Sequence, residues 1–431
     1  MKCRICHNED LIEYLDLGNQ PLADAFVDRE QFDSEADFPL SVVYCPNCSL
    51  SQLSYVVPPE ILYNESYPYE TGMNIEGIKH FRQMAQYLEY RFKPKYVVDI
   101  GSNDGTLLKG FTCKTCGIEP VKEIAEKAGV YTINDFFGSN SVDEALVHGG
   151  KADLITACNV FAHVDNLHGF MWHIDRLLAD DGVFMIEAPY LPDMIDNLAF
   201  DTIYHEHLSY FSIKPLMHLF RQYNMEIFHC EKFPIHCGTM RHYVARRGTH
   251  MMTSAIDIWF EHELKYHDIE KLNDFALEVQ CFRDIFRGSL LRIKTPITTR
   301  RITIYNYFRV VGVSAPAKAN TLLNYCGIGN DIIDYITEKS PRKIGKFTPG
   351  THIPIVPDSK LIEDQPDYAI IFAHNWADQI KEALKDYKGE WVIPNEKGLK
   401  DLCRRAYGVG RQCDCSGTKE KGIHECHGVS G

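Results

Sequence analysis

The sequence lacks any continuous apolar run of the roughly 20 residues that a membrane-spanning helix requires. Its first residues, Met1 to Cys6, hold no apolar core of the kind that secretory signal peptides carry, so we expect no leader. A formal net charge of −14 disfavours a surface that neutralises nucleic-acid phosphates. We therefore expect a cytoplasmic protein whose partners include neither a membrane nor a nucleic acid.

The chain is long, and its overall composition is ordinary. Hydrophobic residues at 45% and charged residues at 24% are typical of a globular protein. A chain of 431 residues exceeds one ordinary core and indicates two or three domains. Fifteen cysteines in such a chain, four of them in two C-x-x-C pairs near its start, indicate reduced thiols and a metal site rather than a disulfide framework.

The two cysteine pairs predict a structural zinc site. Cys3 and Cys6 form the first pair, Cys45 and Cys48 the second, and a C-x-x-C turn delivers two thiolates to one ion. Four thiolates fill a tetrahedral coordination sphere, so we expect a structural ion rather than a catalytic one. The alternative is a set of core cysteines without a metal, which the paired spacing disfavours.

A glycine-containing turn after a buried strand predicts a nucleotide-type cofactor site. The strand covers residues 96–98, and the turn that follows includes Gly101 and Asn103. Glu119 stands 20 positions after Asp99, where the second strand of such a unit ends with an acid that can bind ribose hydroxyls. The pattern fits NAD or S-adenosylmethionine, and the acid that closes the first strand favours S-adenosylmethionine.

Strand-like and helical segments alternate after this turn. Residues 152–158 and 183–188 are expected strands, separated by a helix to about Leu178 and a turn at 180–182. This alternation predicts a parallel doubly wound sheet, in which ligands bind beyond the carboxyl ends of the strands. Four polar residues are expected at that edge: Asn159, His163, Glu187 and Tyr190.

A second αβ unit begins near residue 310. A strand, a turn of small residues and Lys318 at the start of a helix suggest a phosphate site, although a solvated lysine explains them equally well. Further strands are expected at 368–373 and 390–394, and two joining helices at 253–295. Because this unit lacks an acidic ribose site, we expect a Rossmann-like domain that does not bind S-adenosylmethionine.

The segment from Tyr204 to His207 concentrates two imidazoles, a carboxylate and a phenol. It is not the H-E-x-x-H spacing of zinc proteases, so a second, catalytic metal is disfavoured. Buried structural histidines are one interpretation. The interpretation we prefer is an acid–base cluster, because an imidazole has a pKa near 6.5.

These residues resemble the zinc-containing C-methyltransferases that act on nucleotide-linked deoxysugars. The resemblance runs from Cys3 to about Pro394. Besides the cysteine pairs, the landmarks that carry it are residues 17–23, 67–69, 101–105, 117–120, 159–163, 204–207, 315–318 and 349–355.

The resemblance implies an α/β protein with an N-terminal zinc-binding lobe, a central Rossmann-like S-adenosylmethionine-dependent methyltransferase domain and a C-terminal Rossmann-like domain without S-adenosylmethionine. The expected boundaries are 1–75 for the zinc lobe, 76–250 for the methyltransferase domain, 251–305 for a helical connector, 306–397 for the substrate domain and 398–431 for a mobile tail.

The resemblance also implies roles for individual residues. His207 is expected to be the base, with Tyr204, Glu206, His163 and Tyr69 around it. The expected contacts to S-adenosylmethionine come from Gly101, Asn103, Glu119, Pro120, Asn134 and Asn159, and those to the nucleotide sugar from Lys318, His236 and Arg241.

The sequence departs from the family pattern near the expected substrate lobe. Cys237 stands where the family usually has glycine, and residues 314–316 replace a run of glycine and alanine. A tail that holds Cys413, Cys415 and Cys426 is not part of the pattern; a second metal site there is the less favoured interpretation. The identity of the sugar is therefore the weakest inference.

The expected reaction is carbon methylation next to a ketone. A base takes a proton from the carbon next to the carbonyl of a 4-keto sugar, and the resulting carbanion attacks the sulfonium methyl group. Rival hypotheses are methylation of a hydroxyl or amine, a nicotinamide oxidoreductase and a non-enzymatic zinc-ribbon adaptor. The sequence does not determine the oligomeric state.

Overall fold

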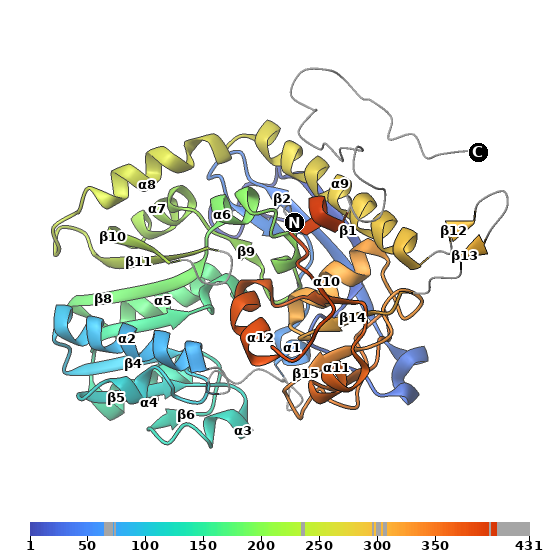
Figure 1. The fold of residues 1–431 in the computed structure, drawn as a ribbon. Helices are drawn as coiled ribbons and strands as arrows, with labels where there is room; N and C mark the ends of the chain where they lie inside the picture. The colour runs from blue at the N-terminus through green and yellow to red at the C-terminus, as the bar shows by residue number, and fades with distance from the viewer. Residues whose placement is uncertain are drawn as a thin grey trace. The chain divides into compact units, whose positions relative to one another are not determined.

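The computed structural model describes residues 1–63, 72, 75–233, 238–294, 297–298, 303–304, 308–395 and 398–402. These residues form two compact units, Met1–Asn273 and Asp274–Gly431. Both are built from strands and helices (Figure 1). Among the described residues, no helix is both long and apolar enough to cross a membrane.

The first unit contains a seven-stranded sheet in the order β10-β11-β8-β7-β4-β5-β6 (Figure 1). The strands from β4 to β8 are parallel, whereas β11 runs antiparallel to both β8 and β10. Their bounds are β4 Tyr96–Ile100, β5 Lys114–Ile118, β6 Thr132–Ile133, β7 Ala152–Cys158, β8 Leu178–Pro189, β10 Met225–Phe233 and β11 Thr239–Arg246.

Helices accompany this sheet. β4, β7 and much of β8 are buried, as expected for parallel strands covered on both faces. The helices of the unit are α2 Ile75–Phe92, α3 Lys122–Ala125, α4 Ser139–Gly149, α5 Leu167–Leu177, α6 Leu191–Asp196, α7 Ile213–Arg221 and α8 Ala255–Glu263, with short turns η3 Leu108–Gly110, η4 Phe161–His163, η5 Phe200–Thr202 and η6 Leu264–Tyr266.

A smaller antiparallel sheet and the two cysteine pairs form what we call the cysteine lobe. Cys3 and Cys6 precede the first strand of this sheet, and Cys45 and Cys48 lie in the loop between its second and third strands. Its order is β1-β2-β3-β9. The strands are β1 Ile12–Pro21, β2 Asp37–Tyr44, β3 Ser51–Leu53 and β9 Ser209–Tyr210, and η1 Arg29–Ser34 and α1 Pro59–Leu62 accompany them. The last strand comes from the chain directly after the histidine segment, so residues that are distant in sequence complete this sheet.

The second unit holds a five-stranded parallel sheet in the order β16-β15-β14-β17-β18. Its bounds are β14 Val310–Val313, β15 Ile336–Glu338, β16 Ile355–Pro357, β17 Tyr368–Ile371 and β18 Glu390–Val392, with α10 Ala317–Cys326, α11 Ser359–Asp364, η7 His374–Trp376 and α12 Ala377–Ala383. The long helix α9, Ile269–Lys294, crosses the boundary between the units, and β12 Ile297–Thr298 pairs with β13 Thr303–Ile304.

The predicted α/β class and most of the predicted elements are confirmed. The strand at 152–158 coincides with β7, and the strand at 183–188 lies within β8. The prediction that a turn at 180–182 separates a helix from the next strand is wrong, because β8 already begins at Leu178. The pairing with β7 skips there from Leu178 to Val183, so the intervening residues are accommodated as an irregularity of the strand.

A buried carboxylate joins α8 to the start of α7. Glu263 is fully buried and accepts hydrogen bonds of 2.8 Å from the main-chain N–H groups of Ile213 and Lys214. The Tyr190 hydroxyl donates to the same side chain over 3.1 Å. The first N–H groups of a helix have no partner within the helix, so this anion satisfies donors that would otherwise be buried without an acceptor.

Replacing Glu263 by Gln should therefore lower the free energy of unfolding by about 1.5–3 kcal/mol, the usual contribution of a hydrogen bond to a charged group. Thermal or denaturant unfolding followed by circular dichroism measures the change. Glu261→Gln is the matched control, because Glu261 lies exposed on the same helix. Equal stability of the two variants would contradict the structural role of Glu263.

Candidate active site

The carboxyl ends of β4 and β7 meet at the point where the strand order of the large sheet reverses. β5 lies on one side of β4 and β7 on the other, so the carboxyl ends of β4 and β7 form the topological switch point, where open parallel sheets bind their ligands. Gly101 follows β4 with φ 65°, and a Cβ atom there would lie 2.4 Å from Cγ2 of Val160. Only glycine fits this close approach of two loops without a shift.

Two asparagines in the loops after β4 and β7 have left-handed backbone conformations. Asn103 has φ 50° and Asn159 has φ 55°. Asparagine tolerates this conformation better than most residues, because its short polar side chain can bond locally. The main-chain N–H of Asn159 donates to the carbonyl of Glu187 over 2.7 Å, which ties the loop after β7 to β8.

Glu119 stands directly after β5 and organises the neighbouring loop. Its carboxylate accepts hydrogen bonds from the N–H groups of Asn103 (3.0 Å) and Val121 (2.9 Å). The side chain is buried, and burial raises its pKa above the ordinary value. The Asn134 side chain donates to the carbonyls of Glu119 and Pro120, both over 2.9 Å. The structure thus brings the predicted cofactor residues to one edge.

His207 is held in one tautomer by the main chain. Its Nδ1 lies 2.7 Å from the carbonyl oxygen of Thr202. A carbonyl only accepts, so Nδ1 carries the proton and Nε2 carries the lone pair. A main-chain carbonyl therefore orients this ring at Nδ1.

His163 lies beside His207, with 5.0 Å between the ring centres. Its Nδ1 is 2.7 Å from the hydroxyl of Tyr63, and its buried Nε2 has no partner among the residues described. Burial, with a smaller contribution from His207, holds the pKa of His163 well below its ordinary value, so this imidazole is neutral at neutral pH. Tyr63, which directly follows α1, is not among the predicted site residues.

The other members of the histidine segment differ in role. The ring of Tyr204 lies 4.1 Å from that of His207, and burial and the charge of Glu206 raise its pKa well above the ordinary value. Glu206 itself is buried. His205 is also buried, and its Nε2 bonds to the carbonyl of Phe38 over 3.3 Å, which indicates a structural role in the cysteine lobe.

A buried ion pair lies at the ends of β8 and β11. Nε and Nη2 of Arg241 donate to one oxygen of Glu187 over 2.9 and 2.6 Å, and His80 bonds to the other oxygen over 2.8 Å. Burial would raise the pKa of Glu187, but the His80 hydrogen bond and the Arg241 charge hold it below the ordinary value. The guanidinium also lies 4.2 Å from the ring centre of Phe233. In this structure Arg241 is therefore engaged within the fold.

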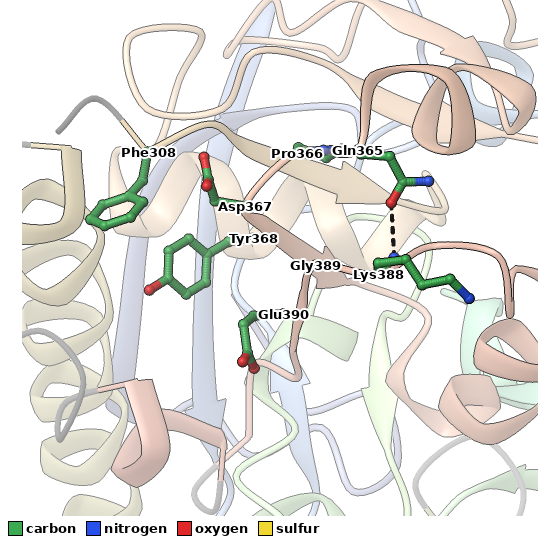
Figure 2. Close-up of a pocket in the computed structure, with 8 residues that line it drawn as sticks. All are labelled: Phe308, Gln365, Pro366, Asp367, Tyr368, Lys388, Gly389 and Glu390. Carbon is green, nitrogen blue, oxygen red and sulfur yellow. Dashed lines mark hydrogen bonds between the residues drawn. The ribbon is translucent and has the colours of Figure 1, made fainter.

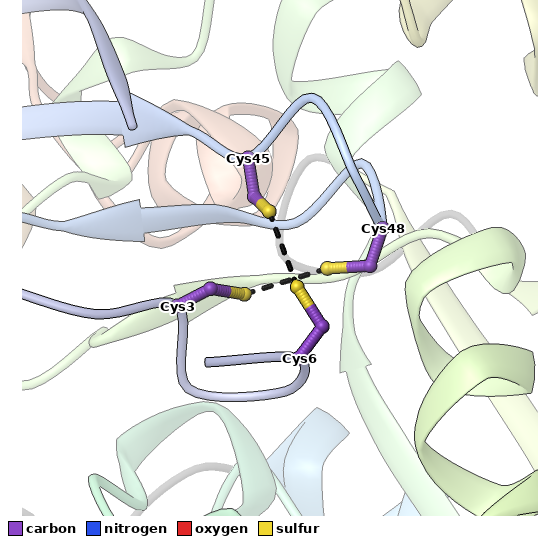
Figure 3. Close-up of side chains that lie close together, drawn as sticks. All are labelled: Cys3, Cys6, Cys45 and Cys48. Carbon is purple, nitrogen blue, oxygen red and sulfur yellow. Dashed lines mark hydrogen bonds between the residues drawn. The ribbon is translucent and has the colours of Figure 1, made fainter. Parts of the chain in front are cut away.

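The sulfur atoms of Cys3, Cys6, Cys45 and Cys48 converge on one point (Figure 3). All four lie within 4.8 Å of one another, with 3.4 Å between Cys3 and Cys48 and between Cys6 and Cys45. A disulfide would need about 2.05 Å. The hydrogen bond from Cys48 lowers the pKa of Cys3 to about 5, which favours a thiolate in the cluster.

This arrangement fits a tetrahedral zinc ion. Zinc–sulfur bonds of about 2.3 Å place the ligands of a tetrahedral site about 3.8 Å apart, within the observed spread of sulfur distances. The two turns also share a conformation, because His7 and Ser49, each one position after a second cysteine, have φ 58° and 66°. The four cysteines would hold the ion and leave it no open position for a substrate.

The second unit presents Lys318 at the N-terminal turn of α10. Its Nζ lies 3.2 Å from Oδ1 of Asn375, which follows β17. Ser314, between β14 and α10, has φ 65°. The strand order reverses between β14 and β17, so these residues lie at the switch point of this sheet.

A shallow cavity of about 380 Å³ in the same unit lies at the opposite edge of the sheet (Figure 2). It is formed at the amino ends of β17 and β18, where Tyr368 and Glu390 begin their strands. Ligands of open parallel sheets bind at the carboxyl ends, so we assign this cavity no role in the chemistry.

Two predicted site residues, Tyr69 and His236, lie outside the described residues, as do Cys237 and the tail beyond residue 402. Lys318 belongs to the second unit and the remaining predicted site residues to the first. Within the first unit, the structure brings the histidine segment and His163 together, and it brings the predicted cofactor residues together at the carboxyl ends of β4, β5 and β7.

Comparison with known proteins matches three family descriptions to successive parts of the chain. A zinc binding domain covers residues 3–63, a methyltransferase domain covers residues 77–229, and a C-methyltransferase C-terminal domain covers residues 234–394. The curated C-methyltransferase NovU of Streptomyces niveus is 29% identical over 413 residues, which cover 91% of this chain and 95% of the relative.

Solved structures resemble part of the chain. A S-adenosylmethionine-dependent methyltransferase from Clostridium acetobutylicum ATCC 824 is 13% identical with a TM-score of 0.32, covering 40% of this chain and 92% of that one. The magnesium protoporphyrin IX methyltransferase ChlM from Synechocystis PCC 6803, solved with bound S-adenosylmethionine, is 10% identical with a TM-score of 0.29, covering 39% and 79%.

The fold and the matched domains define an S-adenosylmethionine-dependent methyltransferase that carries a zinc-binding domain. More particularly, the three matched domains and the curated relative together support a zinc-containing C-methyltransferase. The predicted family, enzyme class and cofactors are thereby confirmed.

Replacing Cys48 by Ser should lower the zinc content of the purified protein well below one ion per chain, because a hydroxyl is a far poorer ligand than a thiolate. Metal analysis after gel filtration measures it. Cys113→Ser is the control, since Cys113 is partly exposed and lies outside the cluster. Unchanged zinc in Cys48→Ser would contradict a four-cysteine site.

Proposed function

We propose that this enzyme methylates a carbon next to the ketone of a nucleotide-linked 4-keto deoxysugar. The observation that carries the chemistry is the hydrogen bond of His207 Nδ1 to Thr202, which leaves the basic lone pair on Nε2. The substrate class rests on the sequence resemblance, and the C-methyltransferase relative supports it at the level of the reaction.

The proposed first step is proton transfer from the sugar to His207. Nε2 takes the proton from the carbon next to the ketone, and the electron pair of the C–H bond moves into an enolate. The bond of Nδ1–H to a carbonyl stabilises the imidazolium that forms. Tyr204, whose ring packs against His207, keeps its own proton, because its pKa is raised well above the ordinary value.

We assign His163 the stabilisation of the enolate oxygen. The pKa of Tyr63 is raised well above its ordinary value by burial and by Glu206, so its hydroxyl keeps its proton and can donate to Nδ1 of His163. That places the imidazole proton on Nε2, the buried atom without a described partner. A neutral N–H in a site with little water is an effective donor to a developing negative charge.

The residues after β4, β5 and β7 would hold S-adenosylmethionine, which supplies the methyl group when bound. Gly101 and Asn103 allow close approach of the backbone, and Glu119 and Asn159 supply polar groups at the same edge. Pro120 and Asn134 shape the wall after β5. The carbon–methyl bond forms as the carbon–sulfur bond breaks, and the electron pair of the broken bond stays on sulfur.

The nucleotide part of the substrate is assigned to basic residues. Lys318, at the start of α10, would bind phosphate together with main-chain N–H groups of that helix. His236, Tyr69 and Arg241 remain proposed substrate or site residues, although Arg241 would have to act beside Glu187. The segmentation 1–75, 76–250, 251–305, 306–397 and 398–431 likewise remains a proposal.

The substrate class is tested by offering the zinc-loaded enzyme a panel of 4-keto nucleotide sugars with S-adenosylmethionine and analysing the products by mass spectrometry and NMR. A new carbon-bound methyl group on one panel member is expected. Methylation of a hydroxyl or an amine, or no product with any 4-keto sugar, would overturn the proposal.

Replacing His207 by Asn should lower methyl transfer, and deuterium exchange at the reacting carbon, by about 10²–10⁴-fold, the usual contribution of a positioned general base. NMR in deuterium oxide measures the exchange, and calorimetry should show unchanged S-adenosylmethionine binding. His205→Asn is the matched control, because that buried imidazole bonds to the cysteine lobe and should affect stability but not rate. Exchange at the normal rate in His207→Asn would exclude it as the base.

A further inference from the structure

A four-cysteine zinc site would have no open position, so any influence on catalysis would pass through neighbouring residues. The turn between Cys3 and Cys6 contributes Arg4 and Ile5, and both contact other parts of the unit. Arg4 is 8% exposed, which is rare for an arginine and implies a specific set of partners.

The guanidinium of Arg4 bonds to three segments. Nε donates to the carboxylate of Asp165 over 2.9 Å, and Nη1 donates to the carbonyls of Leu53 and Leu208, both over 3.1 Å. Asp165 comes two positions after His163, and Leu208 comes directly after His207. One side chain of the zinc turn therefore contacts both chain segments that carry the active-site imidazoles.

Main-chain contacts of the same turn reinforce this connection. The carbonyl of Ile5 accepts hydrogen bonds from Nε2 of His168, at the start of α5, and from the side chain of Gln222. The N–H of Arg4 donates to Gln52 over 2.9 Å, and Gln52 lies on β3 opposite Ser209 of β9. The segment after His207 is thus fixed by strand pairing as well as by Arg4.

We propose that Arg4 is a positioning residue: it couples the zinc turn to both imidazoles and sets the distance between His163 and His207. The proposal deepens the proposed function and rests on it. A zinc ion held by the four thiolates would fix the main chain on either side of Arg4, and the planar guanidinium bonds to both segments that carry the imidazoles. A lysine has no such planar fork and could not hold the same three acceptors in the same geometry.

The test uses the full-length, zinc-loaded enzyme with Arg4→Met and Arg4→Lys. In Arg4→Met, kcat for methyl transfer and the rate of deuterium exchange should both fall about 10-fold or more, since misplacing a reacting group by about 1 Å can cost 10²-fold. KM, the Kd of S-adenosylmethionine and the zinc content should stay within about twofold, because none of those sites loses a ligand. Arg4→Lys should recover part of the rate.

Two further variants separate positioning from a general loss of stability. Arg246→Met removes a partly buried arginine that pairs with Asp175 elsewhere in the same unit; it should lower Tm without lowering kcat. Asp165→Asn removes the carboxylate partner at a partly exposed position and should lower kcat in the same direction as Arg4→Met, by a smaller factor. If Arg4→Met does not fold, the kcat of Asp165→Asn alone tests the proposal.

The outcomes distinguish this inference from the proposed function. Wild-type enzyme that exchanges no carbon-bound proton overturns the proposed function, whatever Arg4 does. If the wild-type enzyme exchanges deuterium at the reacting carbon, and Arg4→Met and Asp165→Asn exchange it at the same rate, the proposed coupling of the zinc turn to the imidazoles is overturned. A drop in Arg4→Met that is matched by an equal loss of zinc or of S-adenosylmethionine binding also overturns it, because Arg4 would then act on the lobe as a whole.

Discussion

The structure of the active site depends on one constraint: a buried main-chain carbonyl needs a hydrogen-bond donor. The histidine segment is a short loop between a turn and a two-residue strand, without an internal ladder to fix it. The carbonyl groups on either side of it have donors. Thr202 accepts from the His207 ring, and Leu208 accepts from the N–H of Leu53 and from Arg4. Leu53 and Arg4, which have no part in the proposed reaction, therefore help to fix the position of the proposed base.

Much of this architecture could be predicted because it depends on periodicity and on residue type. Buried parallel strands such as β4 and β7 appear as short apolar runs, and C-x-x-C pairs can form a four-cysteine site only in a few ways. The parallel order then brings the residues after β4, β5 and β7 to one edge. The only spatial rule that these predictions needed is that the carboxyl ends of parallel strands meet at one edge of the sheet.

The parts that could not be predicted depend on the main chain or on contacts between distant segments. The carbonyl of Thr202 leaves no trace in the residue type, since any residue could supply it. β9 has only two residues, too few for alternation to be detected, yet it completes the sheet of the cysteine lobe. The resemblance assigned Arg241 to the substrate, but nothing in the sequence indicated that Glu187 stands directly opposite it on β8, a pairing that only strand register reveals.

Two buried charged networks of the first unit differ in what they connect. Glu187, Arg241 and His80 join β8, β11 and α2 within one core, so breaking this network should affect stability first. Arg4 instead joins β3 to the two segments that carry the imidazoles. A metal-binding turn is suited to that task, because two thiolate bonds to one ion would fix its main chain in addition to packing. Four thiolate ligands would leave the ion no position for a substrate, so it would not take part in the reaction. The same four ligands would hold the turn rigidly, and Arg4 on this turn can then position the base.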